Sequence, residues 1–167
     1  MPFTQLTLPW TSSTAYLAIY NIGVTGANAY EMVNVITPAA TTITIAAGSA
    51  ANENLVTLSP AFKFAYASPG RRVYLVSGPV SYLCDTSTNT LKRYTGYAIG
   101  SAQPVTASAL SAAGATASLV AANVTNCQLT YVSGTAQRNA LATMTLQIQR
   151  SGESIQLLQE AQIVNTP

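Results

Sequence analysis

The stretch ALATMTLQIQRSGESIQLLQEAQIV, residues 140–164, constrains the fold more than any other part of the chain. Apolar and polar residues alternate from Ala142 to Gln149, which is the period of a strand with one buried face. Ser151 and Gly152 then fit a two-residue turn between paired strands. The pattern therefore predicts an antiparallel hairpin in this stretch.

The register of this hairpin follows from its turn, because pairing Arg150 with Glu153 fixes every later pair. A slip by one residue would move the apolar side chains of the second strand to the opposite face, so the register is well specified. Gln159, opposite Met144, is the one polar residue on the apolar face. The predicted apolar pairs, all on the buried face, are Ile148 with Ile155, Leu146 with Leu157, and Ala142 with Ala161.

Most of the remaining sequence also indicates strands. We therefore expect a mainly β fold of the α+β kind, with an antiparallel sheet, the C-terminal hairpin and one short helix. Pro79 cannot donate a ladder hydrogen bond, so it marks a break between two strands in residues 71–85. The other expected strands are residues 15–23, 41–47, 61–67, 90–99 and 127–132.

Residues 102–122 differ from the rest because they are rich in Ala, Ser and Thr and carry little apolar pattern. We expect a polar surface excursion at about 100–118. The last part of the segment, TASLVAANV, predicts the short helix, with Thr116 near its cap. The side chains expected to face inward from this helix are Leu119, Val120 and Val124.

The length and the charge of the chain limit the classes of protein to which it can belong. A chain of 167 residues suits one domain with a core, so we expect residues 1–167 to form a single globular domain. Charged residues make up 7% of the chain, against about 25% in a typical soluble domain. The basic residues occur as two pairs, at 71–72 and 92–93, and as scattered singles, which does not indicate a nucleic-acid partner. No apolar run is long enough to predict a membrane span, and the first ten residues do not resemble a signal peptide.

The sequence offers no set of residues typical of catalysis, so we expect no enzyme, no catalytic residue, no cofactor and no metal site. It contains no histidine, and its five acids are dispersed. Glu153 and Glu160 share a predicted strand but are an odd number of residues apart, so they point to opposite faces. Residues 21–30, NIGVTGANAY, lack the pattern of a phosphate loop and indicate a turn. Residues 85–90, DTSTNT, also indicate a turn rather than a weak calcium site.

The chain has two cysteines, Cys84 and Cys127. Two cysteines in a chain with so little charge suggest one disulfide and an oxidising compartment. A zinc site lacks ligands, and the spacing excludes a Cys-x-x-Cys redox pair. Cys127 shares a predicted inward face with Leu129 and Tyr131, which suits a disulfide. Two independent buried thiols are the alternative.

The order of several segments resembles a known family. These are YLCD, LKRYTGYAI, an Ala/Ser excursion, LVAANVTNCQLTY, and QRNALATMTLQIQRSGESIQLLQEAQIVNTP. The chain is similar over most of residues 15–167 to the minor pilin of the mannose-sensitive haemagglutinin type IV pilus, the MshO-like group. Pilins of this kind begin with a leader and a long apolar helix, which this sequence does not show. The resemblance therefore implies the C-terminal globular part of such a pilin.

The resemblance implies a structural role without catalysis. The chain would contribute to pilus assembly, to the pilus tip or to surface attachment, with other pilin-like subunits as partners. It would be exported to the cell surface, and an upstream helix would anchor it in the inner membrane before assembly. Without that helix the chain is expected to be monomeric. The alternative is a secreted adhesin or glycan-binding β module, with which nine tyrosines and Thr/Asn-rich loops are compatible.

Overall fold

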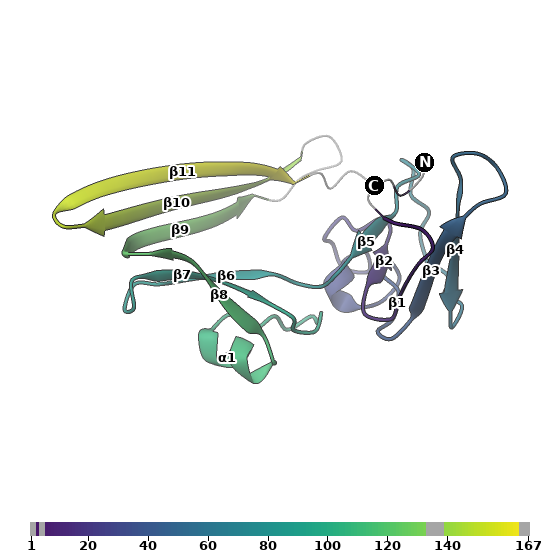
Figure 1. Cartoon of the computed structure of the whole chain (residues 1–167), viewed down its shortest axis with the longest axis horizontal. Coiled ribbons are helices and arrows are strands. Elements are labelled where there is room, and N and C mark those ends of the chain that lie inside the picture. Colours follow the sequence, from purple (N-terminus) through teal and green to yellow (C-terminus); the bar gives the residue numbers. More distant parts are fainter. Residues whose placement is uncertain (1–2, 4–5, 133–138, 164–167) are drawn as a thin grey trace. The chain divides into compact units, whose positions relative to one another are not determined.

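The computed structural model describes residues 3, 6–132 and 139–163 (Figure 1). Within these residues the fold is mainly β, with eleven strands in four antiparallel sheets and one short α-helix. This confirms the expected fold class. The chain divides into two compact units, Met1–Ser77 and Gly78–Thr166. Each unit is described by itself, and the expectation of a single domain over 1–167 stays a prediction.

The first unit contains a three-stranded sheet in the order β1-β3-β4 and a two-stranded ribbon, β2-β5. The elements are β1 (Trp10–Ser12), β2 (Tyr16–Ala18), β3 (Thr42–Ala47), β4 (Asn54–Ser59), β5 (Tyr74–Val76) and a 3-10 helix, Ala29–Glu31. Its core lies between the sheet and the ribbon, where Leu17 of β2 packs with Ile43 and Ile45 of β3. These side chains are buried because β3 alternates Ile with Thr, which turns both isoleucines to one face.

The second unit contains two three-stranded sheets, β6-β7-β8 and β11-β10-β9. Its elements are β6 (Ser81–Asp85), β7 (Thr90–Thr95), α1 (Ala107–Ala112), β8 (Thr116–Ala122), β9 (Val124–Val132), β10 (Ala140–Arg150) and β11 (Glu153–Ile163). A core cluster of Leu91, Val124 and Leu146 joins residues from β7, β9 and β10. A second cluster, of Tyr94, Tyr97 and Leu110, seats α1 against the β7 side of the unit.

The short helix lies earlier in the chain than the sequence predicted. Helix α1 begins after Thr106, whose hydroxyl accepts from the backbone N–H of Ala109 at 3.2 Å. Residues 116–122, predicted as helical, instead form strand β8 along β7. The edge of β7 supplies backbone partners for this segment, and such pairing overrides weak local preference. Leu119 and Val120 are consequently exposed rather than inward, whereas Val124 is buried.

One expected strand is absent from the described residues, and two strands, β1 and β4, were missed in addition to β8. Residues 61–67 carry no strand, and Phe62 and Phe64 contact each other edge to face, with ring centroids 5.0 Å apart. Strand β4 was missed because its outward positions include Leu55, so that alternation is weak in LVTL. Residues 54–59 form a strand because they pair with β3, where Ile45 lies opposite Val56.

The C-terminal hairpin has the predicted register. Arg150 lies opposite Glu153, and the three predicted apolar pairs and the Met144–Gln159 pair all occur. Ser151 and Gly152 both have positive φ, as a type I′ turn requires. The predicted burial of the second strand was wrong, however, because every residue of β11 is exposed in the described structure.

Candidate functional site

Cys84 of β6 and Cys127 of β9 form a disulfide, with their Cα atoms 6.3 Å apart. In their own sheets, Cys84 lies opposite Leu91 and Cys127 lies opposite Leu146. Both cysteines contact the core cluster that contains these two leucines. The disulfide therefore links the two sheets of the second unit through their shared core. It is the pair of residues that the sequence analysis expected to be bonded.

A hollow of about 380 Å³ opens beside the disulfide. Its polar lining comes from Asp85, Lys92, Tyr94 and three hydroxyl side chains, and the rest is apolar. The Tyr94 ring is buried in the second cluster, with Tyr97 and Leu110, so it offers no exposed aromatic face to a ligand. Ligand pockets usually combine apolar walls with a few converging polar groups. The hollow has both, but Asp85 already bonds within its own turn. The lining residues are Leu83, Cys84, Asp85, Thr86, Ser87, Lys92, Tyr94, Val105, Thr106 and Ala107.

Asp85 organises the turn between β6 and β7. Its Oδ1 atom accepts from the Ser87 N–H at 2.9 Å, from the Ser87 hydroxyl, and from the Thr88 N–H at 3.3 Å. Bonds from the side chains of Ser87 and Thr88 lower the pKa of Asp85 from 3.8 to about 2. The carboxylate therefore serves as a turn residue, as the sequence suggested. In the part of the chain that the structure describes, no three His, Cys, Asp or Glu side chains gather to hold a metal ion.

The glycine-containing segment 21–30 also forms a turn. Val24 and Ala27 form an isolated bridge, and the Gly26 N–H donates to Glu31 Oε2 at 2.9 Å. The amide of Asn34 donates to the Gly26 carbonyl oxygen at 3.0 Å. Gly26 has a φ of 79°, a conformation that glycine adopts without strain. This interpretation of the segment as a turn is confirmed.

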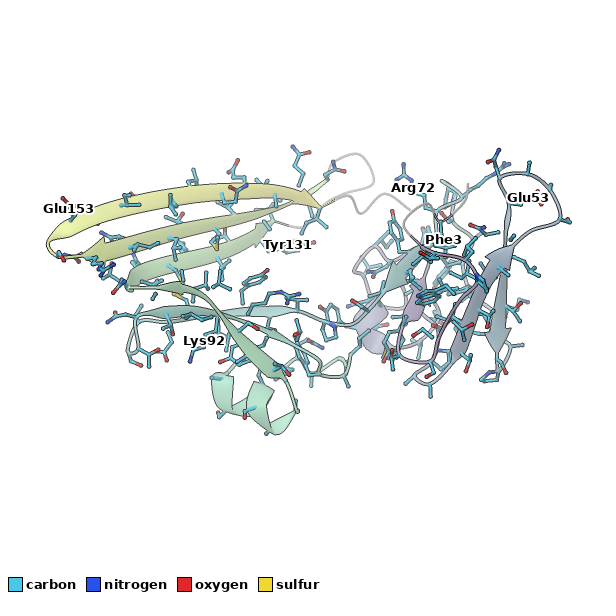
Figure 2. All side chains as sticks on the ribbon, viewed as in Figure 1. Phe3, Glu53, Arg72, Lys92, Tyr131 and Glu153 are labelled. Atoms are coloured by element: carbon cyan, nitrogen blue, oxygen red, sulfur yellow. A yellow bond between two sulfur atoms is a disulfide. The ribbon has the colours of Figure 1, made fainter. Side chains whose placement is uncertain are left out.

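The most distinctive surface is one face of the β9–β10–β11 sheet (Figures 1 and 2). Cross-strand register puts most of the apolar residues of the three strands on this face, which we call the apolar face. Contact with the core cluster buries Val124 and Leu146 and half-buries Met144 and Ile148, and Ala140 is also buried. Elsewhere its large side chains are exposed, namely Leu129, Tyr131, Ile155, Leu157 and Ile163.

The opposite face of this sheet is mainly polar. Thr143, Thr145 and Gln147 of β10 lie on it, as the alternation predicted. Leu158 and Val132 also lie on it and are exposed, which the sequence analysis did not single out. The signal for Leu158 was present, because Leu157 and Leu158 are adjacent and cannot share one face of a strand.

Among the described residues, no helix has the length and apolar character needed to cross a membrane. Comparison of the chain with protein-family models, with curated proteins and with solved structures finds no match. Any functional conclusion therefore rests on the chain's own residues and on the geometry described above.

Proposed function

We propose that this chain is a non-enzymatic structural subunit, a minor-pilin-like or pseudopilin-like domain that contributes to the assembly or tip of a type IV pilus and to surface attachment. The observation that carries this proposal is the apolar face of the β9–β10–β11 sheet. A subunit of an assembly needs a surface that is stable only when a neighbour covers it. Residues that act in catalysis are not needed for that role.

The apolar face is suited to burial against another subunit. Leu129, Ile155 and Leu157 are each exposed by half or more. Covering the remaining surface of such a side chain stabilises an assembly by about 1 kcal/mol, since complete burial contributes about 1.5–3 kcal/mol. Contiguous apolar patches on soluble monomers usually mark interaction sites. The family resemblance supports other pilin-like subunits as the partners that cover this face.

The disulfide supports the proposed location outside the cell. A bond between Cys84 and Cys127 is compatible with an oxidising extracellular compartment. It would also hold the sheet that carries the apolar face against its neighbouring sheet. A pilus subunit exposed to solvent and mechanical load would benefit from that link.

The test is to trace the protein in filaments sheared from the surface of the cells that make it. We expect the wild-type protein in the filament fraction. Leu129→Ser should lower the incorporated fraction because it removes apolar surface from the proposed interface. Val132→Ser is the matched control, since Val132 lies on the same strand with similar exposure, 51% against 50%, but on the opposite face.

A secreted adhesin or glycan-binding module is the second candidate. The hollow beside the disulfide favours it, because a carboxylate, an ammonium and hydroxyl groups line one concave surface. If the wild-type protein is missing from every filament fraction while the purified chain binds a glycan at micromolar affinity, this second function replaces the first. Lys92→Ala should then weaken glycan binding.

A further inference from the structure

Strand β11 forms an edge of its sheet. In the described residues it pairs only with β10, and all of its residues are exposed. Natural proteins protect such edges with short strands, lysine, proline or bulges. Strand β11 is 11 residues long and contains no Lys, Arg or Pro, and its ladder with β10 runs without a register shift. It therefore has the features of a strand that accepts another strand.

The backbone groups available at this edge can be identified from the turn. Arg150 and Glu153 face each other across the two-residue turn and begin the ladder. Alternation along an antiparallel pair then directs the N–H and C=O groups of the even-numbered residues, from 154 to 162, away from β10. Consistent with this direction, the Glu160 carbonyl oxygen accepts a bond from the neighbouring Gln159 side chain at 3.3 Å.

We propose that β11 pairs with β11 of a second copy of this chain, antiparallel and with full overlap about a two-fold axis at Leu158. Leu158 is the midpoint of Glu153–Ile163, so full overlap places it opposite itself. Every even-numbered residue then faces an even-numbered residue of the other copy. The outward backbone groups of the two strands meet, and the two apolar faces stay on the same side of the joined sheet.

The side chains of β11 fit this self-pairing. On the polar face, Leu158 meets Leu158 of the other copy, which buries two side chains that are each 66% exposed. Glu160 meets Gln156, and Glu153 meets Ile163, so no two acids lie directly opposite each other. An isologous two-fold contact is the commonest symmetry of homo-oligomers.

This pairing replaces the expectation of a monomeric chain. It does not depend on the proposed function, because it uses the edge of the sheet and leaves the apolar face uncovered. Filament incorporation and association of the purified chain can therefore succeed or fail separately.

The test uses the full chain and sedimentation equilibrium over a wide concentration range. The wild-type protein should form a dimer whose population rises with concentration. Leu158→Lys and Leu158→Glu should each weaken dimerisation on the order of tenfold or more, because each places two like charges opposite each other. An equal mixture of the two variants should dimerise again, since Lys then faces Glu.

Gln128→Lys provides the matched control. Gln128 and Leu158 both lie opposite Thr145, on either side of β10, and both are exposed on the polar face. The control therefore adds the same charge to the same face without touching the β11 edge, and it should dimerise like the wild type.

Gln156→Pro tests the backbone contribution. Its N–H points away from β10, so proline removes a bond to the second copy without removing one within the hairpin. It should weaken the dimer while circular dichroism shows an unchanged fold.

A wild-type protein that stays monomeric at every concentration would overturn the proposal, as expected if another part of the same chain covers the edge. Equal association of wild type and Leu158→Lys, or failure of the mixture to restore dimers, would also overturn it.

Discussion

Leu146 and Leu157 lie directly opposite each other in the β10–β11 ladder, yet Leu146 is 5% exposed and Leu157 is 50% exposed. They share one face of one sheet. The difference arises because the core cluster with Leu91 and Val124 covers β10 at this point. Within the second unit, no described element covers β11 there. One apolar face thus serves two roles, as core at one strand and as exposed surface at the next.

This difference should appear in the stability of two matched variants. Leu146→Ala should lower the free energy of unfolding by about 2–5 kcal/mol, because it leaves a cavity in the core. Leu157→Ala should cost less than about 1 kcal/mol in the isolated chain, since half of the side chain is already in water. Urea unfolding followed by circular dichroism measures both. Equal costs would show that Leu157 is covered in solution.

The disulfide should make a large contribution to stability. Replacing Cys84 and Cys127 together by serine should lower the free energy of unfolding by roughly 4 kcal/mol, because the bond closes a loop of about 44 residues. Chemical denaturation of the oxidised protein and of the double variant measures the difference. Mass spectrometry of the non-reduced native protein provides the check, and two free thiols would contradict the bond.

Asp85 should titrate well below the ordinary range of a carboxyl group. We expect a pKa of about 2 by NMR, compared with an ordinary value of 3.8, because the Ser87 and Thr88 side chains bond to the charged form. Since the pKa in the folded state is the lower one, the stabilisation by Asp85 is present above about pH 4. It is lost as the pH falls toward 2.

Ser87→Ala should move the pKa of Asp85 back toward its ordinary value, because the Ser87 hydroxyl bond is the largest cause of the shift. Thr86→Ala is the control, since the hydrogen bonds that Asp85 Oδ1 accepts come from Ser87 and Thr88 in the same turn and not from Thr86. If the titration midpoint of Asp85 is the same in Ser87→Ala as in the wild type, this account of the turn is wrong.

Two buried threonines in the first unit should respond oppositely to the same substitution. The Thr37 hydroxyl accepts from the Leu17 N–H at 3.0 Å, so Thr37→Val should lower the free energy of unfolding by about 1–3 kcal/mol. The Thr41 hydroxyl is buried, and it has no hydrogen-bond partner among the described residues. Thr41→Val should therefore leave stability unchanged or raise it. Thermal unfolding of both variants measures the contrast, and a large loss in Thr41→Val would reveal an unseen partner.

The sequence by itself determined the C-terminal hairpin, its turn and its register. These features are local, because Ser151 and Gly152 fix the turn and a strict alternation then fixes every pair from Arg150–Glu153 onward. It also identified the only two cysteines that could bond, and the turn residues at Asp85. For the hairpin and the Asp85 turn, neighbouring residues contain the whole physical reason, whereas the cysteine pair followed from there being two cysteines in the chain.

Tertiary structure decided what the local pattern left open. Residues 116–122 form β8 because the edge of β7 supplies their backbone partners, and α1 forms instead where Thr106 can cap it and Leu110 can enter a core. Alternation of apolar and polar residues predicts which side chains share a face of a sheet. It does not predict whether another layer of the structure covers that face. The exposure of Leu157 and of the β11 edge, on which both proposals rest, was therefore decided by the three-dimensional arrangement of the sheets, because burial depends on residues distant in the sequence.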